Sequence, residues 1–325
     1  MGVGEKHLEA FLKSSQCKVK YICDINPSKI KILTKKYPDI EVIEDYKKII
    51  YDKDIDLVSI ASFDEFHYSQ IKECIKYNKH IIAEKPICLY KKELSHLNQL
   101  LKRKPKIFFG ANMVLRTNPL FKKIRSEIQN NSIGNVFHIE ADYNWGRVHK
   151  LTNGWRNKSK YYSIILGAAV HMVDLTVWML GKLPKEVIAL DNFISTENTN
   201  FRFASFSVLI LRFENGLTVK INANGGCKHP HFHEIKVFGS KKTITHSLNG
   251  SYKIDQNMKQ IIYNKKYAYP AKNERKKLIL SFINNLKSKN STNIISKNEI
   301  FDVMCICFTA IETLKTKKLS DIKYI

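Results

Sequence analysis

The sequence contains no run of about 18 apolar residues, the length that a membrane-spanning helix needs, although 44% of its 325 residues are hydrophobic. Its first residues include Glu5, Lys6 and His7, which do not have the basic-then-apolar layout of a secretion signal. We therefore expect a cytoplasmic protein with no membrane partner. A chain of this length and apolar content can bury two cores of ordinary domain size.

Paired cysteine motifs are missing as well. The chain has seven cysteines, and none of them follow the C-x-x-C spacing of zinc sites and redox motifs. Scattered thiols of this kind indicate a reduced, cytosolic environment and give no sign of a disulfide framework.

Arginine is scarce in a chain whose formal net charge is +24, because only eight of its 54 basic residues are arginines. No block of basic residues alternates with aromatic residues, and no zinc-finger or RNA-binding signature is present. We therefore expect no nucleic-acid partner. Nucleic-acid binding remains a third hypothesis, which predicts strongly salt-dependent retention on DNA. The positive surface would attract anionic substrates such as nucleotide sugars.

The chain opens MGVGEKHLEAF, and no residue in the sequence precedes Met1. A glycine-rich turn that leads into a helix begins a dinucleotide-binding domain, but such a turn follows a buried strand. Helical spacing of apolar residues over 5–12 supports the helix. Either this stretch is not a cofactor loop, or its strand is not part of this sequence.

Strands and helices alternate through the first 112 residues, and the strands are continuously apolar. This alternation predicts an α/β fold with a Rossmann-like doubly wound parallel sheet whose first strand is missing. The expected strands are 19–23, 40–43, 55–62, 80–86 and 106–112, and the expected helices are 5–12, 28–36, 46–51, 67–78 and 90–102.

The regular alternation of strands and helices ends after Asn112. We expect a second, α+β domain over 113–325 with an open, mostly antiparallel sheet. The expected strands are 136–145, 185–193, 201–213, 216–225, 232–238, 243–247 and 251–263, and the expected helices are 118–130, 161–180, 273–288 and 297–315. The domains predicted from the sequence are therefore 1–112 and 113–325.

In a doubly wound domain the ligand lies at the carboxyl ends of the strands. The expected strand 19–23 would be the second strand of such a domain, because the first is missing. It ends at Asp24, twenty residues after Gly4. A carboxylate there can accept hydrogen bonds from both ribose hydroxyls of NAD and would repel the 2′-phosphate of NADP. A turn aspartate is the other interpretation of this residue. We expect NAD, with NADP the less favoured cofactor.

The residues at the ends of the next two strands are candidates for contact with the reacting groups. Strand 55–62 runs into Phe63 and His67, and strand 80–86 ends in Glu84, Lys85 and a proline. A lysine at such a strand end can polarise a substrate hydroxyl and stabilise a developing alkoxide.

His171 and Asp174 lie three residues apart in the apolar stretch 161–180, on one face of the expected helix. A histidine in an apolar helix is usually a hydrogen-bonded core residue. A dehydrogenase, however, needs a base with a pKa near neutral to take the hydroxyl proton as hydride leaves the adjacent carbon.

Six motifs in this order resemble those of one family, essentially from end to end of the chain. The motifs are G-x-x-H at the start, an acid after the second strand, E-K-P, an asparagine–arginine stretch, W-R and a helical histidine. The family is that of glucose–fructose oxidoreductase and inositol dehydrogenase (Gfo/Idh/MocA). The residues that match are Gly4, His7, Asp24, Lys85, Asn112, Arg116, Trp155, Arg156 and His171.

The resemblance implies an NAD(P)-dependent oxidoreductase that acts on a hydroxyl of a sugar, cyclitol or nucleotide sugar, with a role in surface-polysaccharide metabolism. It implies catalysis by Lys85 and His171, no metal, and a homodimer or homotetramer. The substrate-binding residues are then Lys85, Arg116 and Asp174. The cofactor-binding residues are then Gly4, His7, Asp24, Ser62, Phe63, His67, Glu84, Lys85, Asn112, Trp155 and Arg156.

Two departures from the family pattern stand out. The first glycine of the family's loop would fall before Met1, and Gly167 stands where the family has an aspartate four residues before the histidine. These departures support an alternative hypothesis, a non-catalytic relative that acts as a binding or regulatory protein.

The strand order of such a domain would put the first strand in the middle of the sheet. Without it, two central strands would keep unpaired backbone groups. We expect weak cofactor binding and low stability from the chain as given, and the simplest hypothesis is that roughly ten upstream residues are absent.

The stretch HPHFH (229–233) places His229, His231 and His233 at alternate positions, which face one side if they lie on a strand. Three ligands on one strand are too collinear to complete a tetrahedral zinc site. We expect a sheet face near the active site or an oligomer contact instead.

Overall fold

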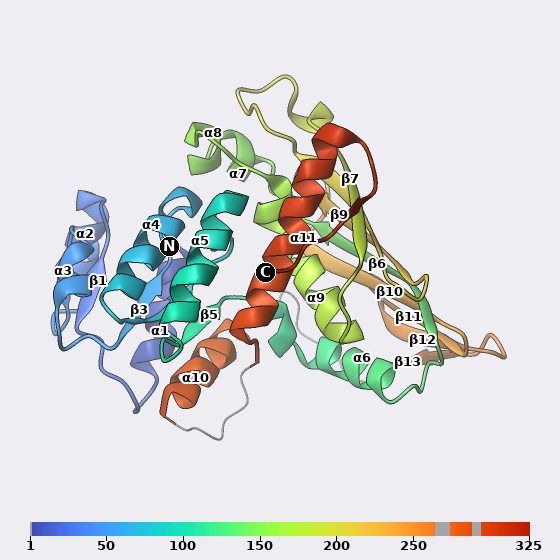
Figure 1. Ribbon diagram of the computed structural model, residues 1–325, viewed down its shortest axis with the longest axis horizontal. Coiled ribbons are helices and arrows are strands. Elements are labelled where there is room, and N and C mark those ends of the chain that lie inside the picture. The colour runs from blue at the N-terminus through green and yellow to red at the C-terminus, as the bar shows by residue number, and fades with distance from the viewer. Residues whose placement is uncertain (1, 264–273, 288–293) are drawn as a thin grey trace. The chain divides into compact units, whose positions relative to one another are not determined.

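The computed structural model describes residues 2–263, 274–287 and 294–325, which form two compact units (Figure 1). Unit 1 comprises Met1–Cys88, Lys92–Asn112 and Asn273–Lys297, and unit 2 comprises Leu89–Lys91, Met113–Lys272 and Asn298–Ile325. The expected boundary after Asn112 coincides with a boundary between the units. The segment 273–297, expected in the second domain, groups with unit 1.

Unit 1 has the alternating architecture expected of a Rossmann-like fold. Helix α10 (Glu274–Lys287) joins it because Ile279 and Ile283 pack against Ala10 of helix α1 in a small apolar cluster. The strands are β1 (Tyr21–Cys23), β2 (Glu41–Ile43), β3 (Leu57–Ile60), β4 (His80–Ala83) and β5 (Phe109–Ala111). The other helices are α1 (Val3–Leu12), α2 (Pro27–Lys36), α3 (Lys47–Tyr51), α4 (Asp64–Lys76) and α5 (Lys91–Arg103).

These strands form two separate parallel sheets, β1–β2 and β3–β4–β5. Among the described residues, β1 and β3 each pair with one strand only, which leaves an open edge on each. Ile25, which follows β1, and Ile32 of α2 are largely exposed, at 67% and 63%. The missing central strand stays a prediction.

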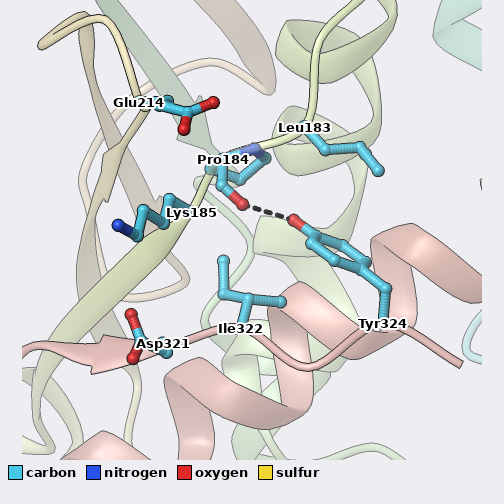
Figure 2. Close-up of a pocket in the computed structure, with 7 residues that line it drawn as sticks. All are labelled: Leu183, Pro184, Lys185, Glu214, Asp321, Ile322 and Tyr324. Carbon is cyan, nitrogen blue, oxygen red and sulfur yellow. Dashed lines mark hydrogen bonds between the residues drawn. The ribbon is translucent and has the colours of Figure 1, made fainter.

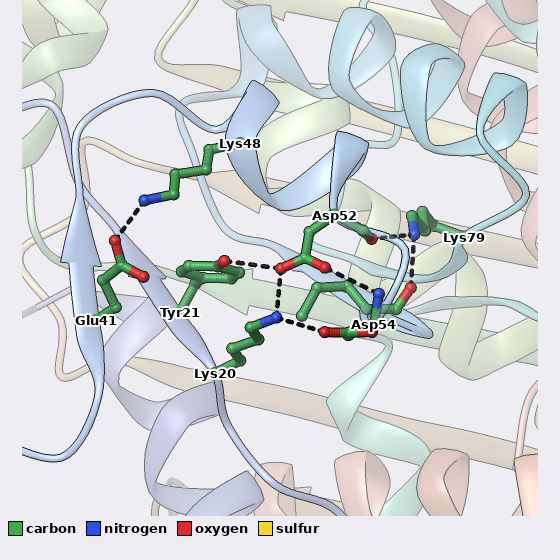
Figure 3. A network of polar contacts seen from close by, with 8 residues as sticks. Lys20, Tyr21, Glu41, Lys48, Asp52, Asp54 and Lys79 are labelled. Carbon is green, nitrogen blue, oxygen red and sulfur yellow. Dashed lines mark hydrogen bonds and ion pairs between the residues drawn. The ribbon is translucent and has the colours of Figure 1, made fainter.

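Side chains tie β1 to the loop before β3 (Figure 3). The Tyr21 hydroxyl donates to Asp52 at 2.7 Å, and the Lys20 ammonium lies 2.6 Å from Asp52 and 2.9 Å from Asp54. Lys79 donates to the backbone carbonyls of Asp52 and Ile55. The hydrogen bond from Lys20 holds the pKa of the Asp52 carboxyl well below its usual range. These part-buried side-chain contacts, and no backbone pairing among the described residues, join β1 to the loop before β3.

Supplying a strand in front of Gly2 should stabilise unit 1 and tighten NADH binding. A fused segment of about ten residues, long enough for one strand and a turn, could pair with the edges of both β1 and β3. We expect a higher melting temperature and a lower Kd in an NADH fluorescence titration. A flexible Gly/Ser segment of the same length is the control, and equal NADH affinity for the two fusions would contradict the expectation.

Unit 2 is built on one nine-stranded sheet in the order β13-β12-β11-β10-β6-β9-β8-β7-β14. All neighbours are antiparallel except β6 and β9, which run parallel. The strands are β6 (Val136–Asn144), β7 (Glu186–Asn192), β8 (Phe206–Arg212), β9 (Thr218–Asn224), β10 (Phe232–Gly239), β11 (Lys242–Ser247), β12 (Gly250–Asp255), β13 (Gln260–Ile262) and β14 (Ser320–Asp321). The expected strand 251–263 is two strands, because a turn with Met258 at φ 58° reverses the chain.

Three helices cover one face of this sheet: α6 (Pro119–Gln129), α9 (Val170–Leu180) and α11 (Lys297–Thr316) (Figure 1). Alternate residues of β6, β8 and β9 are buried, as expected for a sheet with one covered face. The expected helix 161–180 begins as a π-helical turn, η2 (Ile165–Ala169), and ends at Gly181 in the left-handed region. Over the described ranges, we find no helix that combines the length and apolar character needed to cross a membrane.

Candidate active site

A buried polar group lies at the carboxyl ends of β3, β4 and β5. His7 of α1 contacts the Ser59 hydroxyl at 2.8 Å through Nδ1 and the Glu84 carboxylate at 3.0 Å through Nε2. Asn112 donates its side-chain amide to the same Glu84 oxygen. The predicted residues His7, Glu84 and Asn112 therefore meet at one point, and their binding of a cofactor stays a prediction.

Glu84 is held in its ionised form. Burial opposes ionisation, but the hydrogen bonds from His7 and Asn112 and the charge of Arg275 outweigh it and lower the pKa of Glu84 to about 2. A carboxylate fixed this way holds the next residue, Lys85, at the end of β4, and the Lys85–Pro86 peptide is cis. The Oδ1 of Asn112 is buried and has no hydrogen-bond partner among the described residues.

His67 is fully buried and bridges two backbone segments. Its ring nitrogens lie 2.6 Å from the Pro86 carbonyl oxygen and 3.1 Å from the Ser62 carbonyl oxygen. The Ser62 hydroxyl donates to Gln70, and Phe63, 41% exposed, precedes α4. The structure thus favours a structural role for His67, which fixes the loops that carry Ser62 and Lys85, over the cofactor contact expected from the sequence.

The residues expected to bind the cofactor's adenosine half have the chemistry to do so. Helix α1 begins at Val3 with no side-chain cap, so the N–H groups of its first turn can face an anion such as a pyrophosphate. A Cβ added at Gly4 would lie 3.4 Å from Ala61, so this turn packs closely on the end of β3. Asp24 follows β1, accepts from the Asn26 N–H at 2.9 Å and lies 3.4 Å from the Lys29 ammonium. These residues fit a dinucleotide.

His171 of α9 lies in a group of aromatic rings in unit 2. Its ring centroid is 5.9 Å from Tyr143 and 6.3 Å from His233. Tyr143 stacks on His233 at 4.2 Å and its hydroxyl contacts His231 Nε2 at 3.0 Å. The sequence did not single out Tyr143, although its place on an alternating strand put it on the covered face.

Only His233 of the three alternating histidines lies in a strand, because β10 begins at Phe232. His229 lies apart, 3.9 Å from the Glu234 carboxylate. The idea that all three face one side of a strand is therefore wrong. No set of three His, Cys, Asp or Glu side chains within the described residues is arranged to hold a metal ion.

Gly167, which stands where the family has aspartate, has no room for a side chain. A Cβ at this position would lie 2.3 Å from the Tyr162 hydroxyl and 2.8 Å from its ring. The tyrosine therefore occupies the space that an aspartate at 167 would need.

Arg116 and Asp174, expected to bind substrate, bind each other. Each is 1% exposed, and the guanidinium donates from Nε and Nη2 to the carboxylate at 2.7–3.1 Å. Arg116 also pairs with Glu299 of α11. This network joins three helical segments of unit 2, and it favours a structural role for both residues.

Trp155 and Arg156 form the short helix α8 (Trp155–Lys158) of unit 2. The Arg156 guanidinium lies over the Trp155 ring at 4.4 Å and over the buried Trp145 ring at 4.9 Å. These contacts fix the orientation of the guanidinium.

The described surface includes two hollows. The larger, about 510 Å³, is lined by Leu183, Pro184, Lys185, Glu214, Asp321, Ile322 and Tyr324 (Figure 2). The second, about 410 Å³, lies around His80 and Arg103. None of the predicted site residues lines either hollow. Lys85 and His171 belong to different units, so their convergence on one substrate stays a prediction.

A Rossmann-like unit with a buried polar group at the carboxyl ends of its parallel strands has the architecture of a dinucleotide-binding domain, and here the chain joins it to a unit with an open sheet. Residues 1–111 match the family described as "Oxidoreductase family, NAD-binding Rossmann fold", and residues 121–245 match the "GFO/IDH/MocA C-terminal domain". The chain belongs to the GFO/IDH/MocA oxidoreductase family, and unit 1 contains its NAD-binding domain.

Curated relatives agree with this assignment. The chain is 25% identical over 248 residues to the uncharacterized oxidoreductase YrbE of Bacillus subtilis, which covers 74% of this chain and 69% of that protein. It is 24% identical over 254 residues to a myo-inositol 2-dehydrogenase of Thermotoga maritima, which covers 74% and 71%.

Solved structures show the same fold. A scyllo-inositol dehydrogenase from Lactobacillus casei with bound NAD(H) and scyllo-inositol is 16% identical, with a TM-score of 0.80 and coverage of 98% of this chain and 96% of that one. A levoglucosan dehydrogenase in complex with NADH and levoglucosan is also 16% identical, with a TM-score of 0.82 and coverage of 98% and 94%.

Proposed function

We propose that this protein transfers hydride between NAD and a CH–OH carbon of a sugar, a cyclitol or a nucleotide sugar. The observation that carries the proposal is the E-K-P segment at the end of β4. There Glu84 is fixed by His7 and Asn112, and Lys85 follows it at the edge where a Rossmann domain binds its ligands. Several curated relatives are inositol dehydrogenases, which supports this class of substrate.

The chain's own residues divide the work of such a reaction. Asp24 would accept hydrogen bonds from the adenosine ribose, which favours NAD over NADP, and the N–H groups at the start of α1 would bind the pyrophosphate. NAD, when bound, supplies the hydride acceptor. The Lys85 ammonium holds the reacting hydroxyl and stabilises the negative charge that develops on its oxygen. The His171 imidazole takes the hydroxyl proton in oxidation and returns it in reduction.

Within the family, the stretches NMVLRT (112–117) and GAAVHMVD (167–174) resemble members that act on the sugars of surface polysaccharides. Nucleotide sugars are the usual activated form of such sugars, and the net charge of +24 would draw an anionic substrate toward the protein. We therefore propose a cytosolic role in surface-polysaccharide sugar metabolism.

The test measures NADH binding by fluorescence and then NADH oxidation or NAD reduction over a panel of cyclitols, sugars and nucleotide sugars. We expect NADH to bind and at least one panel member to turn over. If the protein binds NADH and a sugar but turns over no member of the panel, the alternative of a binding or regulatory protein is favoured. Gly167, in place of the family's aspartate, also favours this alternative.

The uncovered face of the sheet in unit 2 should mediate a homodimer or homotetramer. Leu190 of β7 is 52% exposed, and Ile188 of the same strand and the paired residues Val208 and Ile210 of β8 point to the same face by strand alternation. Replacing Ile210 with aspartate should shift the sedimentation coefficient to that of a monomer. Thr218→Asp, on the polar part of the same face, should have a smaller effect. A wild-type chain that sediments as a monomer would refute the expectation.

A further inference from the structure

Three basic side chains of unit 2 form a group here named the cationic cluster: Arg147, Lys150 and Arg156. The Lys150 N–H donates to the Arg147 carbonyl oxygen at 2.9 Å, so these two residues share one turn of the chain, and the Arg156 guanidinium lies 4.9 Å from the ring of Trp145, two residues before Arg147. Burial and the positive charges of Arg147 and Arg156 lower the pKa of Lys150. No carboxylate of the described residues forms an ion pair with any of them.

Within the cationic cluster, Arg156 is enclosed by aromatic rings and keeps one buried donor without a partner among the described residues. The Arg156 guanidinium lies among the rings of Trp145, Trp155 and Tyr162 at 4.4–5.8 Å. Its Nε is buried and has no hydrogen-bond partner in the part of the chain that the structure describes. An unpaired buried donor is destabilising and rare in folded proteins, so such an atom points to a ligand or a bound water.

The cationic cluster continues into the ring group around His171. Gly146, with φ +58°, has the His229 carbonyl oxygen where a side chain would begin, so the segment before β10 packs against the turn that carries Arg147. His231 follows, and burial and the charges of Arg147 and Lys150 lower its pKa to about 4. His231 Nε2 contacts the Tyr143 hydroxyl, and the Tyr143 ring contacts the ring of His171.

His231 has a further unused atom on this path. When the Tyr143 hydroxyl donates to Nε2, the neutral imidazole carries its proton on Nδ1, which is buried without a partner among the described residues. The nearest acids on these strands, Asp142 and Glu234, are paired residues of β6 and β10. They alternate with Tyr143 and His233 and so point to the other face of the sheet, where they cannot neutralise the cationic cluster.

We propose that the substrate carries a carboxylate or phosphate group, and that the cationic cluster of Arg147, Lys150 and Arg156, extended by His231, binds this group while the reacting hydroxyl lies toward His171. The inference rests on the proposed function for the role of His171, and it assigns Arg156 to the substrate in place of the cofactor contact that the family resemblance implies. Among sugars it selects anionic ones: uronic acids, sugar phosphates and nucleotide sugars. Two basic side chains and a fixed guanidinium match the oxygens of either anion.

The experiment compares matched neutral and anionic ligands by isothermal titration calorimetry. Glucose and glucuronate are titrated into the full chain in the presence of NADH, followed by glucose 6-phosphate. The variants are Arg147→Gln/Lys150→Gln and, as control, Lys236→Gln on the opposite face of the sheet. We expect an anionic sugar to bind at least tenfold more tightly than glucose, and the double variant to lose that preference by roughly tenfold to a hundredfold. The control should keep it, and the NADH Kd should not change.

Three outcomes would overturn the inference. The first is equal affinity for neutral and anionic sugars. The second is an anion preference that the double variant retains. The third is a double variant that loses NADH affinity instead, because the anion held by the cluster would then be the dinucleotide's pyrophosphate. A chain that prefers anionic sugars but shows no turnover would support the inference and contradict the proposed dehydrogenase activity, so the two failures are distinguishable.

Discussion

Replacing His171 with asparagine should lower kcat/KM for the preferred substrate by roughly a hundred- to ten-thousandfold, the usual contribution of a positioned acid–base group. Asparagine keeps a polar side chain of similar size but cannot exchange a proton near neutral pH. Lys85→Met should cause a loss of similar size, because it keeps the aliphatic stem and removes the ammonium that stabilises the developing alkoxide. Steady-state NADH kinetics measures both.

The controls separate chemistry from folding and cofactor binding. His138→Asn changes a histidine of unit 2 that bonds Thr218 on the uncovered face of the sheet, and Lys92→Met changes an exposed lysine of α5. Both should keep near wild-type activity, and all four variants should keep NADH affinity. If His171→Asn retained full turnover, the assignment of the proton transfer to this imidazole would be wrong.

Replacing Arg116 with methionine should lower the free energy of unfolding by about 3–5 kcal/mol, because it leaves the Asp174 carboxylate buried without its partner. Both side chains are 1% exposed, so water cannot replace the lost guanidinium. Urea denaturation measures the loss. Arg125→Met is the matched control on α6: it removes a hydrogen bond to the Trp178 carbonyl but no ion pair, and should cost only about 1 kcal/mol.

The loss in Arg116→Met should depend on pH with a definite sign. Burial already raises the pKa of Asp174 against the pull of Arg116, and without that charge the pKa should rise further. In the folded variant the Asp174 carboxyl would then keep its proton at pH values where the same group in the unfolded chain has already lost it. The free energy of unfolding of the variant therefore falls as pH rises. The defect should be smaller at pH 5 than at pH 8. A double change, Arg116→Met/Asp174→Leu, should recover stability and lose this pH dependence.

The order of elements could be predicted from the sequence because each strand and helix shows its own period. Apolar runs such as 55–62 and 80–86 identify buried strands, and their carboxyl ends indicate where polar residues such as Glu84 gather. The family motifs then supplied roles for Lys85 and His171. The hydrogen bonds that join His7, Glu84 and Asn112 were not predicted, because they depend on the tertiary position of α1 beside the strand ends.

Pairings between distant residues could not be predicted in this way. Arg116 and Asp174 were expected to bind substrate, since sequence spacing does not show that two charges 58 positions apart satisfy each other. His67 resembled a cofactor contact for the same reason, although its ring links two carbonyls inside the fold. The unit membership of α10 likewise depends on a tertiary contact, that of Ile279 and Ile283 with Ala10.

The open edge between β1 and β3 also concerns how the cofactor and the fold depend on each other. The β1–β2–α2 lobe, which is joined to β3 by side chains and not by a continuous backbone ladder, should open at lower free energy than the β3–β4–β5 core. Asp24 lies on this lobe. The binding free energy of a dinucleotide that bridges Asp24 and the start of α1 is therefore reduced by the free energy needed to order the lobe. Amide hydrogen exchange in β1 and β2 should therefore slow more than exchange in β4 when NADH is added.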